Sequence, residues 1–405
     1  MTNNLPLADV KILDLMWVMA GPAGTRVLAD YGATIVRVES AQKIDTARML
    51  QPFHGRKPGP DSSALFQNLN AGKLGLALDL NNPVARDVVR DLVRWADVVT
   101  ESFSPKAMKG WDLDYESLRK IKPDIIMISS CLMGQTGPMA KFAGFGNLAA
   151  ALSGFFNLTG WPDRIPAGPF SAYTDYVAPR FTAIAILAAL DHRRRTGQGQ
   201  NIDQSQAEAT LHFLSPAILD YTANGRVQEA MGNRDLYCAP HGVYPAAGTD
   251  RWVAITVETE DQWRSLCEVM QRKDLIDDVR FATREARLAH QDELDVLIGE
   301  WTTQYDPARV EEMLQARKVS AGAVLSMHEA YKDPQLAHRN HFIQLEHPTY
   351  GTTTIEGSRL RMSRTPANVQ RCAPTIGRDN QYVLESILGY NEEKITELVA
   401  AGALE

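Results

Sequence analysis

The sequence predicts an α/β fold with a parallel sheet, because short apolar runs alternate with helix-like segments through its N-terminal part. The run over 10–15 has the apolar character of a buried strand, and a glycine turn from Gly21 to Gly24 follows it. A helix over 25–31 and a strand over 33–38 complete a strand, turn, helix and strand unit of about 30 residues. Such alternation favours a parallel sheet with helices on both faces.

The alternation continues along the chain. Val84, Val88, Val89 and Leu92 fall on one side of the helix predicted over 83–95, as expected for a helix packed on a sheet. Apolar runs predict further strands over 74–80, 97–100 and 125–129, and the remaining patterns predict helices over 115–121, 144–154 and 203–219.

The pattern changes between 222 and 245, where Asn224-Gly225 and Gly232-Asn233 are loop signals. A second, smaller α+β unit is predicted beyond this point, from a strand over 252–257 and helices over 261–270, 291–303 and 306–316. Towards the C-terminus the sequence predicts a hairpin of strands over 352–356 and 358–362, then helices over 381–388 and 392–401.

The composition is that of an ordinary globular protein, with 44% hydrophobic and 22% charged residues among 405. The net charge of -7 argues against a general nucleic-acid binder, but leaves room for an anionic ligand held by local Lys and Arg. The four cysteines have no metal-binding spacing and indicate a reducing environment. We expect a cytoplasmic protein that does not enter the membrane, because no segment is long enough to span a bilayer and the first residues lack signal-peptide features.

One acid, Asp175, stands shortly before the segment over 181–190, which is apolar on every side and therefore predicted to be a buried helix. An Asp in this place is commonly a helix cap or a turn residue. The alternative is a carboxylate nucleophile, which must be ionised yet poorly solvated. Small and aromatic neighbours such as Ala172, Tyr173 and Tyr176 would provide that environment.

Other motifs are weaker. The cadence Gly21-x-x-Gly24 is not the GxGxxG of dinucleotide-binding proteins, although Glu39 closes the second strand where a ribose-binding acid would stand. The nine histidines are scattered and predict no metal site. His241 lies in a Pro-His-Gly loop and could be an active-site residue or an ordinary loop histidine; its role stays open.

The chain resembles the class III CoA-transferases, the family of formyl-CoA transferase and carnitine CoA-transferase, over nearly its whole length. The resemblance rests on short motifs in a characteristic order, which include Ala20-Gly-Pro22, Leu28-Ala-Asp-Tyr-Gly-Ala33, Leu76-Ala-Leu-Asp-Leu80, Thr196-Gly-Gln-Gly-Gln200, Asp333-Pro-Gln335 and Ala373-Pro-Thr-Ile-Gly377. It implies a Rossmann-like large domain of residues 1–220 to which 330–405 return, a small domain at 225–325, and an interlocked dimer.

The family's catalytic aspartate falls on Asp175. Its CoA contacts fall on Met19, Ala20, Ser40, Asn70, Ala71, Gly72, Lys73, Ser102, Phe103, Ser104, Gly144, Phe145, Gly146 and Asn147. Ser40, Ser102, Lys106 and Gly110 depart from the family's usual residues. We therefore expect the CoA phosphates to be held by nearby cations, of which the candidates are Arg37, Arg48, Lys73, Lys106 and Lys109.

The resemblance implies an enzyme that moves CoA from an acyl-CoA donor to a carboxylic acid acceptor through an aspartyl-acyl anhydride, with no tightly bound cofactor and no metal. A homodimer is expected, or a heteromer with a related chain. The related α-methylacyl-CoA racemase uses a His-Asp pair where this chain has Phe145 and Gly146, neither of which can move a proton. A racemase-like enzyme and a non-catalytic acyl-CoA-binding subunit remain the alternatives.

Overall fold

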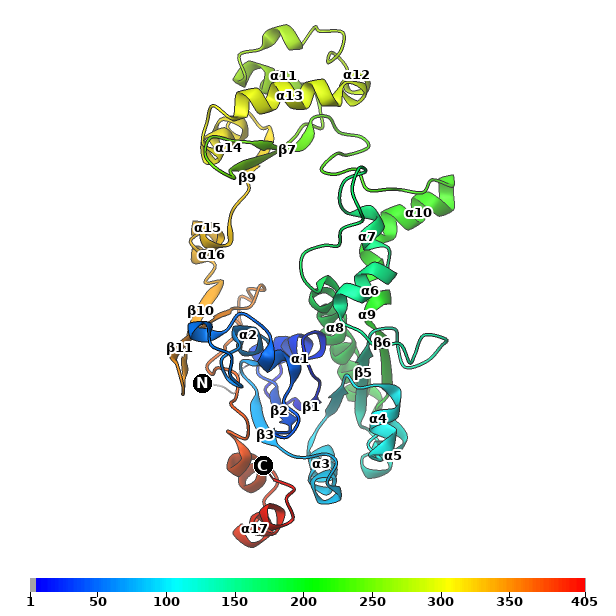
Figure 1. The fold of residues 1–405 in the computed structure, drawn as a ribbon. Coiled ribbons are helices and arrows are strands. Elements are labelled where there is room, and N and C mark those ends of the chain that lie inside the picture. Colours follow the sequence, from blue (N-terminus) through cyan, green and yellow to red (C-terminus); the bar gives the residue numbers. More distant parts are fainter. Residues whose placement is uncertain (1–4, 405) are drawn as a thin grey trace. The chain divides into compact units, whose positions relative to one another are not determined.

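The computed structural model describes residues 5–404 and has a mixed α/β fold. The chain divides into two compact units, whose segments can be followed by their colours in Figure 1. The first unit runs to Phe156 and resumes over 168–227 and from Gln335 onwards. The second unit comprises 157–167 and 228–334. The segment 157–167 thus groups with the second unit, although the resemblance places it within the large domain.

A six-stranded parallel sheet forms the centre of the first unit, in the order β3-β2-β1-β4-β5-β6. Leu13 of the central strand lies opposite Val36 on one side and Val99 on the other. The order reverses between β1 and β4, so the chain crosses over at that point. The strands are β1 (Lys11–Leu15), β2 (Thr34–Glu39), β3 (Leu74–Ala77), β4 (Val98–Glu101), β5 (Ile126–Cys131) and β6 (Asn201–Ser205).

Helices cover both faces of this sheet, as the alternation in the sequence predicts. Ile12 and Leu13 point to opposite faces. Ile12 packs with apolar residues of α1 (Ala20–Asp30) and α8 (Tyr173–Thr196). Leu13 packs with α3 (Pro83–Trp95), α5 (Tyr115–Ile121) and C-terminal residues such as Leu398. The first unit also contains α2 (Ala64–Asn70), α4 (Pro105–Gly110), α6 (Gly146–Leu152) and α17 (Glu392–Ala400).

The helix α8 differs from the prediction in two ways. It begins at Tyr173, so that Asp175 lies in the first turn of the helix and not in a loop before it. It is also not buried on every side, because Ile184 is 62% and Leu187 is 42% exposed. Both residues lie on the face away from the sheet, and residues 5–404 of this single chain leave them uncovered.

Two further segments differ from the prediction. The helix predicted over 203–219 is wrong at its start, because 201–205 form the edge strand β6; α9 (Gln206–Leu211) and α10 (Ser215–Asn224) follow. The hairpin predicted from strands over 352–356 and 358–362 does not form. Its strand β11 (Gly351–Glu356) pairs instead with the preceding β10 (Phe342–His347), and 358–362 form no strand. The short helices α7 (Phe155–Leu158) and α16 (Pro334–His338) lie where the two units meet along the chain.

The second unit is a small α+β structure with its own apolar core. An antiparallel sheet of β7 (His241–Pro245), β8 (Trp252–Thr256) and β9 (Ser320–Ala323) packs with helices around Trp263 and Phe281. Its helices are α11 (Glu260–Val269), α12 (Arg284–Ala289), α13 (Gln291–Thr302), α14 (Pro307–Gln315) and α15 (Met327–Tyr331).

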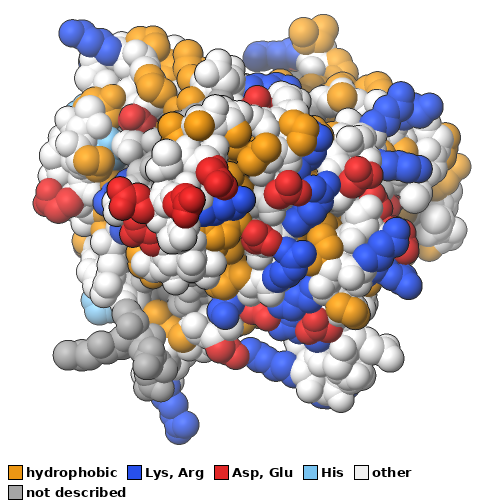
Figure 2. Space-filling view, turned by 90° about the horizontal axis from the view of Figure 1, so that it is seen from below, with side chains coloured by type: hydrophobic (Ala, Val, Ile, Leu, Met, Phe, Trp, Pro, Cys, Tyr) orange, Lys and Arg blue, Asp and Glu red, His pale blue; other side chains and the backbone are white. Residues whose placement is uncertain are grey.

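Basic and acidic side chains are interspersed on the molecular face seen in Figure 2, in keeping with the small negative net charge. No helix among residues 5–404 combines the length and the apolar character that a membrane crossing requires.

Candidate active site

A cavity of about 240 Å³ opens at the carboxyl edge of the parallel sheet, where the strand order reverses between β1 and β4. Such a switch point is the usual ligand site of an open α/β sheet, because the loops after the two strands diverge there. We call it the Asp175 cavity. It is lined by residues 17–21 after β1, 102–105 after β4, 130–132 of β5 and its loop, 140–145, Asp175 and Gln206.

Asp175 is the buried acid of this cavity, with 5% of its surface exposed. Burial raises the pKa of its carboxyl to about 7, although a hydrogen bond from the backbone N–H of Gly146 opposes the shift. Its place in the first turn of α8 also favours the charged form. The group is therefore ionised in a substantial fraction of molecules at neutral pH and remains poorly solvated.

Gly146, the first residue of α6, lies against this carboxyl group. A Cβ at this position would come within 2.7 Å of Asp175 Oδ1 and 2.8 Å of Thr174 Oγ1. The Thr174 hydroxyl also donates a hydrogen bond to the Gly146 carbonyl at 3.1 Å. The starts of α6 and α8 are thus in direct contact, and only glycine permits the close approach.

The backbone around Asp175 has two unusual features. Ser171, two residues before α8, has a positive φ of 62°, which turns the chain sharply into the helix. Pro179 lies inside α8 and lacks the N–H that would otherwise reach the carbonyl of Asp175. The first turn of α8 is therefore held largely by its packing, including Tyr173 against Phe155 at 5.0 Å between ring centroids.

A second cavity of about 250 Å³ adjoins the first and shares Trp17, Phe103 and Ser104 with it. Ser40 and Lys43, which follow β2, line its other end. Trp17 packs against Phe103 at 5.8 Å, and the ammonium group of Lys43 lies 5.9 Å from the Trp17 ring. The two cavities are therefore neighbours along the carboxyl edge of the sheet, with Asp175 in the first and Ser40 in the second.

The structure brings about half of the predicted CoA contacts to these cavities. The Asp175 cavity is lined by Met19, Ala20, Ser102, Phe103, Ser104, Gly144 and Phe145, and the second cavity by Ser40. Gly146 touches Asp175, and Asn147 follows it in α6. Neither of these two residues lines either of the two cavities, and the same is true of Arg48, Asn70, Ala71, Gly72 and Lys73.

Three of the five cations predicted to hold phosphates are fully buried and already bound. Lys73 donates to Asp14 at 2.9 Å, to Asn70 at 2.9 Å and to the Pro22 carbonyl at 3.0 Å, and burial lowers its pKa to about 8. Arg37, the second buried cation, pairs with Asp45. Arg48, the third, pairs with Glu39 and Asp61 and donates to the carbonyls of Pro60 and Pro374. The other two candidates, Lys106 and Lys109 of α4, are exposed.

Sequence reasoning missed several residues of the site. Lys43 follows a predicted strand, so the rule that ligands bind at carboxyl ends could have found it. Lys141 lies in a loop that carries no such signal. Gln206 was missed because the sequence predicts that it lies within the helix over 203–219 and not at the end of a strand. Between residues 5 and 404, no cluster of three or more His, Cys, Asp and Glu could hold a metal ion.

His241 belongs to the second unit, where its Nδ1 lies 2.6 Å from the carbonyl oxygen of Asn233. It lines a cavity of that unit together with Trp161, Arg234 and Tyr244. Arg234 there pairs with Asp292 and Asp295.

The chain matches the model of CoA-transferase family III over residues 7–380. It is 33% identical to succinyl-CoA--D-citramalate CoA-transferase of Chloroflexus aurantiacus, covering 98% of this chain and 97% of that one. It is 34% identical to succinate--glutarate CoA-transferase of Agrobacterium fabrum, covering 94% and 96%. A solved CAIB/BAIF family protein from Brucella suis superimposes with a TM-score of 0.87 at 30% identity, over 95% of this chain and 100% of that one.

The family match covers segments of both units. It includes the loops that line the Asp175 cavity and the buried carboxyl group of Asp175 itself. The chain belongs to the family III CoA-transferases and is an enzyme that transfers CoA between acyl-CoA and acid substrates.

Proposed function

We propose that Asp175 is the nucleophile and that the reaction passes through an aspartyl-acyl anhydride. A carboxylate oxygen of Asp175 attacks the thioester carbonyl carbon, the C–S bond breaks, and CoA leaves as a thiolate with the electron pair. The acceptor carboxylate then attacks the aspartyl carbonyl carbon and displaces the donor acid. The CoA thiolate finally attacks the acceptor's acyl carbon and returns the electron pair to Asp175.

The observation that carries this proposal is the buried, partly ionised carboxyl group at the end of the cavity. Cys131 brings a thiol to the lining, but burial raises its pKa to about 11 and keeps it protonated. No histidine lines this cavity within the described part of the chain, and Gly146 stands beside Asp175 without a titratable side chain. The site therefore favours covalent catalysis over the proton transfer that a racemase needs.

We propose that the CoA substrate lies along the two joined cavities, with its thioester at Asp175 and its nucleotide towards Ser40. The contacts retained in this proposal are Met19, Ala20, Ser40, Ser102, Phe103, Ser104, Gly144, Phe145, Gly146 and Asn147, with Lys43 and Lys141 added as cations that line the cavities. An ammonium group serves as a point charge for phosphate, which suits Lys43 and Lys141.

We propose a dicarboxylic acid as acceptor and succinyl-CoA as donor. The names of four relatives carry this part: they act on succinyl-CoA or succinate together with citramalate, glutarate or L-malate. All of these acids keep a second carboxylate after the first becomes a thioester. A panel of acyl-CoA donors and mono- and dicarboxylic acceptors, with the products identified by mass, tests the assignment.

Replacing Asp175 by Ala or Asn tests the mechanism. We expect turnover to fall by about 1,000-fold or more, because the covalent step has no other nucleophile. The wild-type chain incubated with an acyl-CoA should show an intact-mass adduct on the peptide that contains Asp175, and the variants should not. Cys131→Ser is the matched control, since it changes the thiol in the lining and should retain turnover. Undiminished turnover of Asp175→Ala would disprove the mechanism.

We also propose that a second copy of the chain covers the exposed apolar side chains of α8, α10 and the turn between α9 and α10. Ile184 and Leu187 lie on α8, and the others are Phe213, Ile218, Leu219 and Tyr221, each exposed in the single chain. Ile184→Asp should lower the mass measured by light scattering from that of a dimer to that of a monomer.

Two relatives are alpha and beta subunits of a succinyl-CoA--L-malate CoA-transferase, so a heteromer with a related chain is the alternative. Full activity of the purified chain alone would exclude it.

A further inference from the structure

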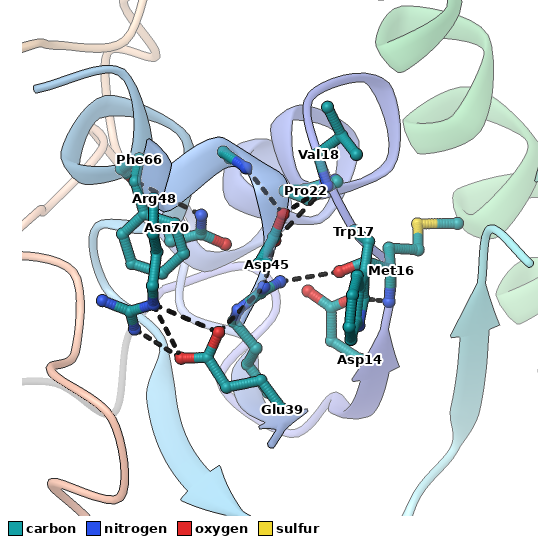
Figure 3. A network of polar contacts seen from close by, with 12 residues as sticks. Asp14, Met16, Trp17, Val18, Pro22, Glu39, Asp45, Arg48, Phe66 and Asn70 are labelled. Carbon is teal, nitrogen blue, oxygen red and sulfur yellow. Dashed lines mark hydrogen bonds and ion pairs between the residues drawn. The ribbon is translucent and has the colours of Figure 1, made fainter. Parts of the chain in front are cut away.

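The wall of the Asp175 cavity after β1 is anchored in an unusual way. Residues 16–18, which we call the wall segment, form neither helix nor strand. Four of their backbone groups bond to side chains from other parts of the first unit. Figure 3 shows the bonds to Asp14 and Asp45. The Met16 N–H donates to Asp14 at 3.0 Å, and the Met16 carbonyl accepts from Arg37 at 2.6 Å. The position of the wall is thus set from outside the segment.

The next two residues are held in the same manner. The Trp17 N–H donates to the hydroxyl oxygen of Ser102 at 2.9 Å, which links the loops after β1 and β4 across the switch point. The Val18 N–H donates to both carboxylate oxygens of Asp45, at 3.0 and 3.3 Å. Trp17 and Val18 both line the Asp175 cavity, and Met19 and Ala20 continue the same wall.

Val18 needs such an anchor because its backbone is strained. Its φ of 64° lies in the left-handed region, which a β-branched residue adopts only at a considerable energetic cost. A conformation of this kind persists only where the surroundings impose it. The two bonds from Val18 to Asp45 are the contacts that hold the strained N–H in place.

Asp45 and Arg37 are both fully buried and form an ion pair. Asp45 also accepts the N–H of Ala47 at 2.9 Å, and Arg37 lies 5.3 Å from the ring of Phe66. Neither Asp45 nor Arg37 lines either cavity. The pair therefore touches the wall segment, and Arg37 also lies 3.5 Å from Glu39 of the second cavity, but neither Arg37 nor Asp45 reaches the space that the substrate would occupy.

We propose that Asp45, held by Arg37, is a positioning residue for CoA transfer: the pair fixes residues 16–18 so that the β1 wall of the cavity faces Asp175. The role in the chemical step rests on the proposed function of Asp175, whereas the role in shaping the cavity does not. The inference replaces the expectation that Arg37 holds a CoA phosphate.

The test is Asp45→Asn in the full chain. Displacing a reacting group by about 1 Å can cost about 100-fold in rate, so we expect kcat/KM to fall by about that factor well below the melting temperature. Asp61→Asn is the matched control. It removes a carboxylate 2.9 Å from Arg48, another fully buried guanidinium, but Asp61 makes no bond to residues 16–18. The control should lower stability while retaining kcat/KM within about 3-fold, as expected when no catalytic geometry changes.

The readouts separate positioning from simple support of the fold. A purely structural role would lower the melting temperature and leave kcat per folded molecule unchanged, which would overturn the proposal. A phosphate contact through Arg37 would reduce the preference for CoA over 3′-dephospho-CoA, whereas positioning should reduce the rates with both substrates equally. A selective loss of that preference would also overturn the proposal.

A second variant covers the case in which Asp45→Asn does not fold. That substitution removes the nearest acid from the buried Arg37 and leaves it with Glu39 at 3.5 Å. Arg37→Met together with Asp45→Leu removes both charges, and such replacements of a buried pair are often tolerated. The double variant should fold and show the same loss of kcat/KM; wild-type kinetics in a folded double variant would disprove the role of the pair.

Measuring the dissociation constant of CoA, with Asp175→Asn as the background, separates this proposal from the proposed function. If Asp175→Asn keeps its turnover, the covalent mechanism fails. Weaker CoA binding after Asp45→Asn in that same background still supports a wall set by Asp45, and unchanged binding there refutes it.

Discussion

The interiors of the two units contain very different side chains. Beneath the Asp175 cavity the first unit buries a set of charged groups, among them Asp14, Arg37, Asp45, Arg48 and Lys73. The core of the second unit is apolar around Trp263 and Phe281, and Arg287 is the buried charged side chain found there among residues 228–334. Burying charge is costly and seldom the most stable choice for a core. The first unit accepts that cost where a cavity wall must be fixed.

Arg287 shows what a single buried charge does in the second unit. It donates to the carbonyls of Ala239 and Phe281 at 2.9 and 3.0 Å and pairs with Glu260 at 2.8 Å. Its guanidinium also lies 5.0 Å from the Trp263 ring. These contacts join the segment before β7 to a helix and to the apolar core, so the charge stabilises the unit.

The largest effect on stability should follow from emptying the apolar core of the second unit. Trp263 is 1% exposed, and Trp263→Ala should lower the free energy of unfolding by about 3–5 kcal/mol, because it removes a large buried ring and leaves a cavity. Trp252→Ala in the same unit changes a residue that is 39% exposed and should cost about 1 kcal/mol or less. Chemical denaturation of both variants checks the contrast, and equal losses would contradict it.

The next effect concerns activity and should be confined to the first unit. Gly146→Ala places a Cβ 2.7 Å from Asp175 Oδ1, so the carboxyl group or α6 must move. We expect kcat to fall by about 100-fold, as is typical of a misplaced reacting group. Gly322→Ala in β9 is the control, because a Cβ there meets no atom within 4 Å. Steady-state kinetics of the two variants decide the matter: comparable activities would show that the contact at Gly146 has no catalytic importance.

The pH dependence of stability should also distinguish the first unit. Because burial raises the pKa of Asp175 from 3.8 to about 7, the folded state holds more protons than the unfolded state between these values. This carboxyl group therefore lowers stability progressively as pH rises through that window, and the loss is complete above pH 7. Asp175→Asn should be more stable than the wild type at pH 8 by about 1–4 kcal/mol, with a smaller difference at pH 5.

The same titration should appear in the kinetics. The acid limb of kcat/KM should follow the ionisation of Asp175, with activity falling below a pH of about 7. Burial also raises the pKa of Glu101 to about 7, but Glu101 lies outside the lining of the cavity. A Glu101→Gln variant that keeps the acid limb assigns it to Asp175, and a variant that loses the limb assigns it to Glu101.

The smallest effect should come from the ion pair of the buried Arg287 in the second unit. Glu260→Gln leaves Arg287 with its two backbone acceptors, so we expect a loss of about 1 kcal/mol in unfolding free energy. Glu268→Gln weakens an exposed pair with Arg317 at 3.5 Å and should have almost no effect. Thermal unfolding compares the two, and a large loss from Glu260→Gln would mean that the second unit also depends on buried charge.

Much of the fold was predictable from local pattern, since β1 to β5, α3 and α5 are short apolar or amphipathic runs with clear ends. The edge strand β6 was missed because its residues, Asn-Ile-Asp-Gln-Ser, are mostly polar and gain their partners from β5 alone. The true start of α8 was missed because Pro179 normally argues against a continuous helix.

For the site, position along the chain predicted the loops but not the partners of the charged residues. The sequence indicates that Arg48 and Lys73 lie near the expected CoA site. It does not indicate that Glu39 and Asp14 neutralise them, because the fold alone brings these pairs together. The sequence pattern of a cation bound to phosphate is the same as that of a cation paired with a buried acid.

The anchors of residues 16–18 hold the main chain and not its side chains. The identities of Trp17 and Val18 are therefore free to change while the wall stays in place. An enzyme built in this way can be retargeted to acids of another size by substitution at the wall, because the scaffold that fixes the geometry is separate from the surface that selects the substrate.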